Sequence, residues 1–70
     1  MFVKVKSTMG IISMININHI EVVGQNEKFI VITTKSTRIE VAGDMESFSK
    51  TLSDIMKTKQ IMWYKPQETK

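Results

Sequence analysis

The side chain with the widest chemical repertoire in this sequence is its single histidine, His19. A histidine acts as a general base only beside a nucleophile or another positioned group, and its neighbours Asn18, Ile20 and Glu21 supply none. One imidazole cannot hold a metal ion alone, and the sequence has no cysteine to supply thiolate ligands. We therefore interpret His19 as a solvated turn residue and predict no metal site.

Two other catalytic patterns are also missing from the sequence. Gly10, Gly24 and Gly43 are isolated, so no glycine-rich loop can cradle a phosphate. Asp44 and Glu46 are close together, but they precede an apolar helical pattern, where acids stabilise the start of a helix. We predict a protein that is not an enzyme and that uses no cofactor.

The residues best suited to binding are aromatic and lie near the C-terminus. Ile61-Met62-Trp63-Tyr64 places four large apolar side chains in succession. The run could be a sixth strand or a helix extension that completes the core. Alternatively, Trp63 or Tyr64 could anchor a protein partner, because Trp and Tyr dominate interface hot spots. The sequence leaves both alternatives open.

A second candidate binding surface comes from strands that are apolar on both faces. Residues 29–34 predict the strongest strand, which directs Ile30 and Ile32 to the face opposite Phe29 and Val31. Residues 11–15 repeat the pattern, with Ile11 and Ile15 on one face and Ile12 and Met14 on the other. A single helix covers only one face of a sheet. We therefore predict that Ile30 and Ile32, together with Trp63 and Tyr64, contact a partner.

The elements that would position these residues follow from periodicity and turn signals. Alternation and β-branched residues predict strands over 2–7, 11–15, 20–23, 29–34 and 37–41. Asp44 is a good N-cap, and an apolar stripe predicts a helix from Asp44 to Lys57, formed by Met45, Phe48, Leu52, Ile55 and Met56. The predicted fold class is α+β: an antiparallel β-meander of about five short strands followed by one C-terminal amphipathic helix. We predict one domain over residues 1–66 and a frayed tail over 67–70.

Length and composition predict self-association. A chain of 70 residues buries a modest core, and without cysteine it cannot add disulfides. Oligomerisation, most simply a homodimer, would cover the second apolar face. The alternative is a closed barrel that remains a monomer. We predict no membrane span and no secretory signal, and therefore a cytoplasmic protein. Ile, Lys, Asn and Met are frequent and Leu is rare, which indicates a low-GC bacterium or a phage.

The net charge of +3 leaves two kinds of partner open. Lysines are scattered among acids, and there is one arginine, whereas nucleic-acid binders usually show a clustered basic stripe. We therefore expect a protein partner, with a small nucleic-acid-binding or transcription-regulatory domain as the alternative. Clustering of Lys4, Lys6 and Arg38 on one sheet face would favour nucleic acid. Their separation by Glu21 and Glu40 would favour protein.

The layout resembles the small FlbD/SwrD family of flagellar and swarming-motility proteins. The resemblance rests on Phe2-Val3-Lys4-Val5, Ile15-Asn16, Ile20-Glu21, Phe29-Ile30-Val31-Ile32-Thr33 and Glu46-Ser47-Phe48. It implies a motility accessory protein; a phage-encoded modulator of a host protein would fit the same features. Residues 11–54 also resemble the first half of a LytTR DNA-binding domain, notably at Ile20-Glu21 and Thr33-Thr34-Lys35. The basic second half of that family has no counterpart in these 70 residues.

Overall fold

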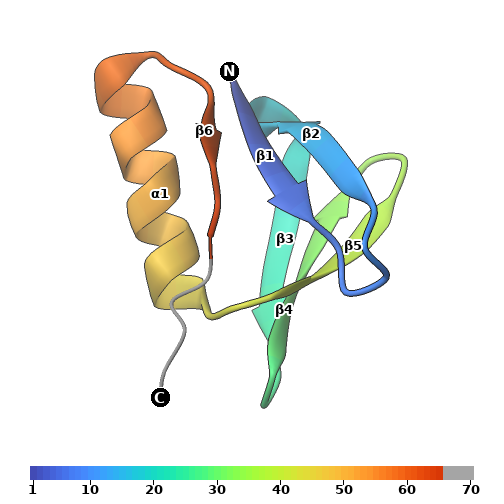
Figure 1. The fold of residues 1–70 in the computed structure, drawn as a ribbon. Coiled ribbons are helices and arrows are strands. Elements are labelled where there is room, and N and C mark those ends of the chain that lie inside the picture. The colour runs from blue at the N-terminus through green and yellow to red at the C-terminus, as the bar shows by residue number, and fades with distance from the viewer. Residues whose placement is uncertain (66–70) are drawn as a thin grey trace.

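The computed structural model describes residues 1–65 and has the predicted α+β fold (Figure 1). The elements, in chain order, are β1 (Phe2–Lys6), β2 (Ile12–Asn16), a 3-10 turn (Ile17–His19), β3 (Ile20–Gln25), β4 (Phe29–Thr34), β5 (Arg38–Ala42), α1 (Met45–Thr58) and β6 (Met62–Trp63). Residues 66–70, which include the predicted frayed tail and the predicted domain boundary, lie outside the described residues.

The strands form two small sheets, with strand orders β2-β1-β6 and β3-β4-β5. Within them, β1–β2, β3–β4 and β4–β5 are antiparallel pairs. The meander is broken between β2 and β3, where the Asn16 side chain accepts a hydrogen bond from the Asn18 N–H and a 3-10 turn redirects the chain. The two sheets meet at one corner, through a bridge between Ser7 and Val41.

One segment differs from the sequence expectation, and another takes one of the two forms that the sequence left open. Gly24 and Gln25, expected in a loop, extend β3 and pair with Val31 and Ile30. Of the two structural alternatives for residues 61–64, the structure has the sixth strand: β6 lies parallel to β1, with Met62 opposite Val3 and Trp63 opposite Lys4. The pairing continues beyond the strand, because the Tyr64 N–H donates to the Lys4 carbonyl at 2.8 Å.

The core lies between the sheets and under the helix. Its buried apolar side chains come from β1, β2, β4, β5, α1 and the end of β6: Val3, Val5, Ile15, Ile30, Ile32, Val41, Phe48, Ile55 and Tyr64. Alternate residues of each strand contribute, as a half-buried strand requires. Every buried side-chain oxygen or nitrogen in residues 1–65 has a hydrogen-bond partner.

Helix α1 begins and ends with recognisable caps. The Asp44 carboxylate accepts a 2.7 Å hydrogen bond from the Ser47 N–H, and Lys59 ends the helix in a left-handed conformation. The predicted apolar stripe is wider than the buried face: Phe48 and Ile55 are buried, whereas Met45 is 40% exposed and Met56 is 60% exposed. The helix makes its main contacts with β1, β3 and β6.

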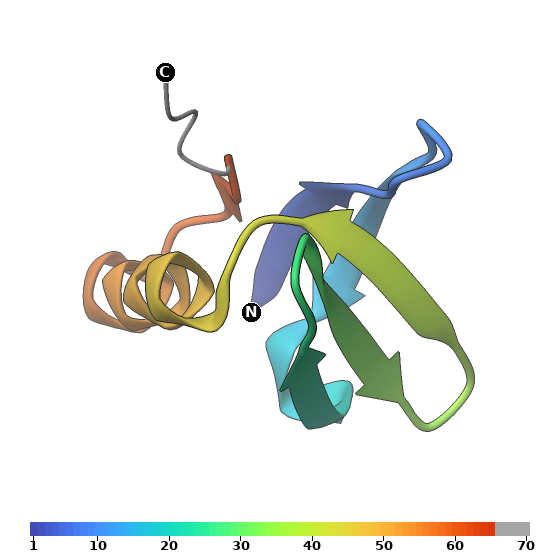
Figure 2. The ribbon, with the colours of Figure 1, turned by 90° about the horizontal axis from the view of Figure 1, so that it is seen from below.

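Figure 2 shows the arrangement along the helix axis. Helix α1 lies at one side of the two sheets, and the β1–β2 and β4–β5 turns lie on the other side, away from it. The helix therefore closes the opening between β3 and β6. The opening between β2 and β5 has no helix over it. No helix within residues 1–65 is both long and apolar enough to cross a membrane.

Candidate functional site

Three of the four residues predicted to contact a partner are core residues instead. Ile30 and Ile32 are fully buried, and Tyr64 is 2% exposed. The isoleucines point between the sheets because the other face of β4, with Phe29 and Val31, is the outer one. These three side chains are therefore unavailable to a partner in this fold. Only Trp63, which is 39% exposed, remains at the surface.

His19 was interpreted from the sequence as a solvated turn residue without a catalytic or metal-binding role. It ends the 3-10 turn, is exposed, and lies at the rim of a groove described below. In the part of the chain that the structure describes, no three His, Cys, Asp or Glu side chains come together as a metal site.

The most unusual strand of the described chain is β2, because apolar side chains are exposed on its outer face. Its register with β1 places Ile12 opposite Lys6 and Met14 opposite Lys4. Ile12 is 55% exposed and Met14 is 50% exposed, while Ile15 on the other face is buried. The strand Ile12-Ser13-Met14-Ile15-Asn16 carries no charge. It is thus an apolar strand at the surface of the molecule.

One edge of β2 has no strand beside it in the described structure, because β2 ends its sheet. Hydrogen bonds to β1 run through the odd-numbered residues: the Ser7 N–H donates to the Ile11 carbonyl, and the Ile17 N–H donates to the Met1 carbonyl. In an antiparallel pair, hydrogen-bonded and non-bonded positions alternate. The backbone groups of Ile12, Met14 and Asn16 therefore point away from β1, toward open space.

The other free edges of the two sheets carry the protection that natural proteins use against unwanted pairing. Strand β3 has a register shift that leaves Glu21 as an extra residue. Strand β5 places Arg38 and Glu40 along its length, and β6 is only two residues long. Strand β2 has no proline and no charge. It is therefore the unprotected edge among the described strands.

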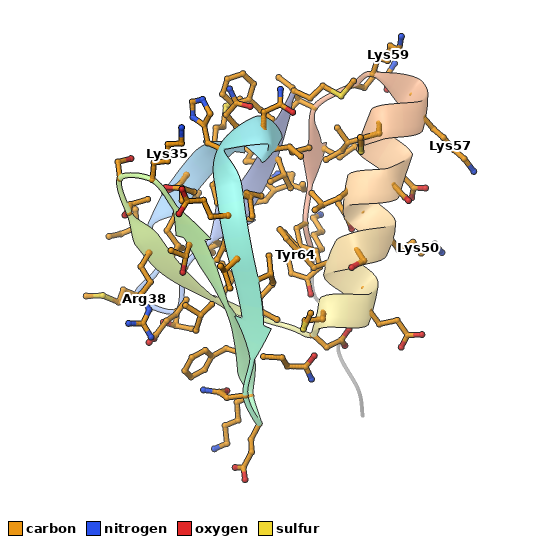
Figure 3. The ribbon with its side chains drawn as sticks, turned by 180° about the vertical axis from the view of Figure 1, so that it is seen from behind. Lys35, Arg38, Lys50, Lys57, Lys59 and Tyr64 are labelled. Atoms are coloured by element: carbon orange, nitrogen blue, oxygen red, sulfur yellow. The ribbon has the colours of Figure 1, made fainter. Side chains whose placement is uncertain are left out.

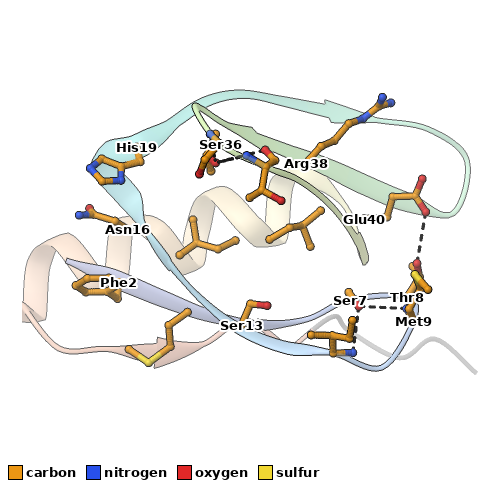
Figure 4. Close-up of a pocket in the computed structure, with 16 residues that line it drawn as sticks. Phe2, Ser7, Thr8, Met9, Ser13, Asn16, His19, Ser36, Arg38 and Glu40 are labelled. Carbon is orange, nitrogen blue, oxygen red and sulfur yellow. Dashed lines mark hydrogen bonds between the residues drawn. The ribbon is translucent and has the colours of Figure 1, made fainter.

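A groove runs beside this edge, between β2 and β5 (Figure 4). Its cavity volume is about 940 Å³. On one side it is lined by Ile11 and residues 13–16, and on the other by residues 36–40. Consecutive residues of a strand point to opposite faces of the sheet. Consecutive residues line this groove, so the groove runs along the edges of the strands and does not lie over one face of a sheet.

The groove has an apolar floor and a polar rim. Ile15 and Ile39 contribute to its apolar surface, and Phe2 lies at one end. The other end is closed where the sheets join, since the Thr8 N–H donates to the Glu40 carbonyl at 2.8 Å. Around the rim stand side chains of opposite charge, Arg38 and Glu40. The rim is therefore not dominated by one sign of charge.

The cationic side chains do not form one surface. Lys4 and Lys6 lie on the outer face of the first sheet, where the Lys4 ammonium is 5.0 Å from the centre of the Trp63 ring. Arg38 lies on the outer face of the second sheet, and the neighbouring outward position on the same strand is Glu40. Figure 3 shows Lys50, Lys57 and Lys59 along the helix, and Lys35 and Arg38 on the other side of the molecule. By the criterion set from the sequence, this separation favours a protein partner.

The sequence analysis named candidate contact residues on β4 and noted the doubled apolar pattern of residues 11–15, but it did not single out Phe2 or Met9 and did not identify β2 as the strand with an open edge. A usable signal was present: residues 7–20 contain no Asp, Glu, Lys or Arg, the longest such stretch in the chain. An uncharged stretch containing a strand predicts a covered edge or an interaction edge. The structure shows that this edge is not covered.

Comparison with known proteins gives no relative for this chain: no protein-family model, no curated protein and no solved structure matches it. The resemblances to the FlbD/SwrD family and to the LytTR domain therefore remain predictions from the sequence.

Proposed function

We propose that this protein is a non-catalytic interaction module that forms a homodimer and binds a protein partner. The observation that carries the proposal is the edge of β2, which is uncharged, unpaired and flanked by exposed apolar side chains. An edge of this kind pairs readily with another strand. A motility accessory protein or a phage-encoded modulator of a host protein would use such a surface, and the predicted cytoplasmic location belongs to the same proposal.

The size of the exposed surface supports this proposal. We define the β2 patch as Phe2, Met9, Ile11, Ile12 and Met14, all more than one-third exposed. Their combined exposed area is on the order of 500 Å², comparable to the largest apolar patch on a typical monomer, roughly 300–600 Å², which often marks an interaction site. Covering this patch removes apolar surface from water, which drives association.

Sedimentation equilibrium at micromolar concentration tests the homodimer. We expect a mass of two chains for the parent protein. Ile12→Lys adds a charge to the open edge and is expected to weaken the dimer about tenfold or more, which corresponds to at least ~1.4 kcal/mol of association free energy. Met56→Lys is the matched control, because Met56 is similarly exposed but lies on the helix. A parent protein that has the mass of one chain throughout would contradict self-association.

A nucleic-acid-binding function is the alternative, and one observation favours it. The outer face of the first sheet carries Phe2, Lys4, Lys6 and Trp63, two aromatic rings beside two cations. Aromatic stacking combined with positive charge is how single-stranded nucleic acids are bound without sequence preference. The Lys4 ammonium already lies over the Trp63 ring, which leaves less of that ring free for a base.

Anisotropy of a labelled single-stranded oligonucleotide distinguishes the two functions. Under the protein-interaction proposal, binding is weak, decreases steeply with salt because counterions are released, and is absent at physiological salt. Lys4→Gln/Lys6→Gln, compared with Lys50→Gln/Lys57→Gln, shows whether any binding is local to the first sheet. Tight, sequence-selective binding at physiological salt would establish the alternative function.

A further inference from the structure

We infer that two copies of this chain join through antiparallel pairing of β2 with β2, about a two-fold axis at Met14. The two three-stranded sheets would then form one continuous sheet with the order β6-β1-β2-β2-β1-β6. The inference rests on the proposed homodimer and specifies its interface and register.

The hydrogen-bonding groups of the edge fix which residues can face each other. The backbone groups of Ile12, Met14 and Asn16 point away from β1, so these positions must form the hydrogen-bonded pairs of any added strand. Complete overlap of the five residues places Met14 opposite Met14 and Ile12 opposite Asn16. Three such pairs exchange about six backbone hydrogen bonds, since each hydrogen-bonded pair exchanges two.

The edge is complementary to itself in charge. No residue of β2 is charged, so the two central strands bring no like charges together. The nearest cations in the central row are the two copies of Lys4, which stands beside Met14 on β1. They would be three strand spacings apart, about 14 Å, and at physiological ionic strength charges separated by more than about 8 Å are largely screened.

Apolar contacts form in the same register. On the outer face, the two Met14 side chains would be direct cross-strand neighbours, and Ile12 of each copy would lie diagonally beside Met14 of the other. Ile12 and Met14 of both copies would thus form one apolar row across the seam, and burial of their facing sides would add to the backbone hydrogen bonds. The groove beside β2 is open over Ile11 and residues 13–16, which leaves space along the edge for a second strand.

Cysteine cross-linking tests the register, because the chain has no cysteine of its own. In the proposed pairing the Cα atoms of the two Met14 residues are about 5.5 Å apart, within the range of disulfides. We expect Met14→Cys to form a disulfide-linked dimer on mild oxidation. Ser13→Cys reports the alternative register shifted by two residues, in which Ser13 faces Ser13, and Ser49→Cys on the exposed helix surface reports random collision.

The outcomes separate this inference from the broader proposal. A two-chain mass in sedimentation together with rapid cross-linking at Met14→Cys, and slow cross-linking at Ser13→Cys and Ser49→Cys, would support both. A two-chain mass without preferential Met14→Cys cross-linking would overturn the β2 register and leave the homodimer standing. A one-chain mass in sedimentation would overturn both and leave the edge for a strand from a foreign protein. Circular dichroism of reduced Met14→Cys verifies that this variant is folded.

Discussion

The Tyr64 hydroxyl lies 2.7 Å from the Ser47 hydroxyl, and this contact fastens the end of β6 to the first turn of α1. The same hydroxyl accepts a hydrogen bond from the Asp44 N–H at 3.1 Å, next to the helix N-cap. The Tyr64 ring packs edge-on against Phe48, with ring centres 5.1 Å apart. Tyr64 is therefore a structural residue that joins the end of β6 to α1, while its neighbour Trp63 faces outward.

Removal of that hydroxyl tests the role of Tyr64. Tyr64→Phe keeps the ring contact with Phe48 but leaves the Asp44 N–H without its side-chain partner. We expect the free energy of unfolding to fall by about 1–3 kcal/mol, the cost of an unsatisfied buried polar group. Urea denaturation measures the change. Ser49→Ala, at an exposed helix position, should change stability by less than about 0.5 kcal/mol; equal effects for the two variants would contradict this role for Tyr64.

Gly43 and Gly24 form a matched pair for a second prediction. Gly43 has φ of +138°, and a Cβ atom there would collide with the Tyr64 ring and hydroxyl. Gly43→Ala should therefore destabilise the fold by about 1–3 kcal/mol through backbone strain, with the collision adding to this. Gly24 has open space around its Cα, so Gly24→Ala should be close to neutral. Thermal melts of the two variants compare them directly, and a Gly43→Ala variant as stable as Gly24→Ala would contradict both the backbone strain and the collision.

The helix face gives a graded prediction. Ile55 is fully buried, Leu52 is partly buried and Met56 is 60% exposed. Ile55→Ala should cost about 2–5 kcal/mol, because a cavity remains in the core, whereas Leu52→Ala should cost less. Met56→Ala should have almost no effect. Chemical denaturation gives the order, and a Met56→Ala variant as unstable as Ile55→Ala would mean that the helix is rotated or that Met56 is covered in a dimer.

Acid should weaken the start of the helix. The pKa of the Asp44 carboxyl is lowered, first because this carboxyl accepts a hydrogen bond from the Ser47 N–H, and further by the Ser47 side chain. The folded state thus binds this proton less tightly than the unfolded state does. The stabilisation is complete above the unfolded pKa, near 3.8, and is lost as the pH falls through the folded pKa. Asp44→Asn keeps a capping oxygen but does not titrate. The unfolding free energy of the variant should therefore fall less between pH 5 and pH 2 than that of the parent protein. The difference between the two proteins is that expected from the titration of one carboxyl group.

Local chemistry determined the elements of this fold. Asp44 followed by Glu46 and a 3.6-residue apolar period specifies a helix, because capping and amphipathic burial depend on residues within a few turns of one another. Alternating side chains likewise specified the strands of the first 42 residues. These local signals predict the α+β class and the position of the helix. They also offer a sixth strand as one of two alternatives for residues 61–64.

Tertiary pairing decided which apolar residues are available to a partner. The side of β6 that faces the core depends on its register with β1, and this register buries Tyr64 and exposes Trp63. Likewise, Ile30 and Ile32 are core residues because the second sheet packs on the first, while Ile12 and Met14 are exposed because they lie on the outer face of the first sheet, beside Lys6 and Lys4. Contacts between distant parts of the chain thus decide which of these side chains are buried and which are exposed. The periodicity of one strand identifies its two faces, but it does not show which face the rest of the chain will cover.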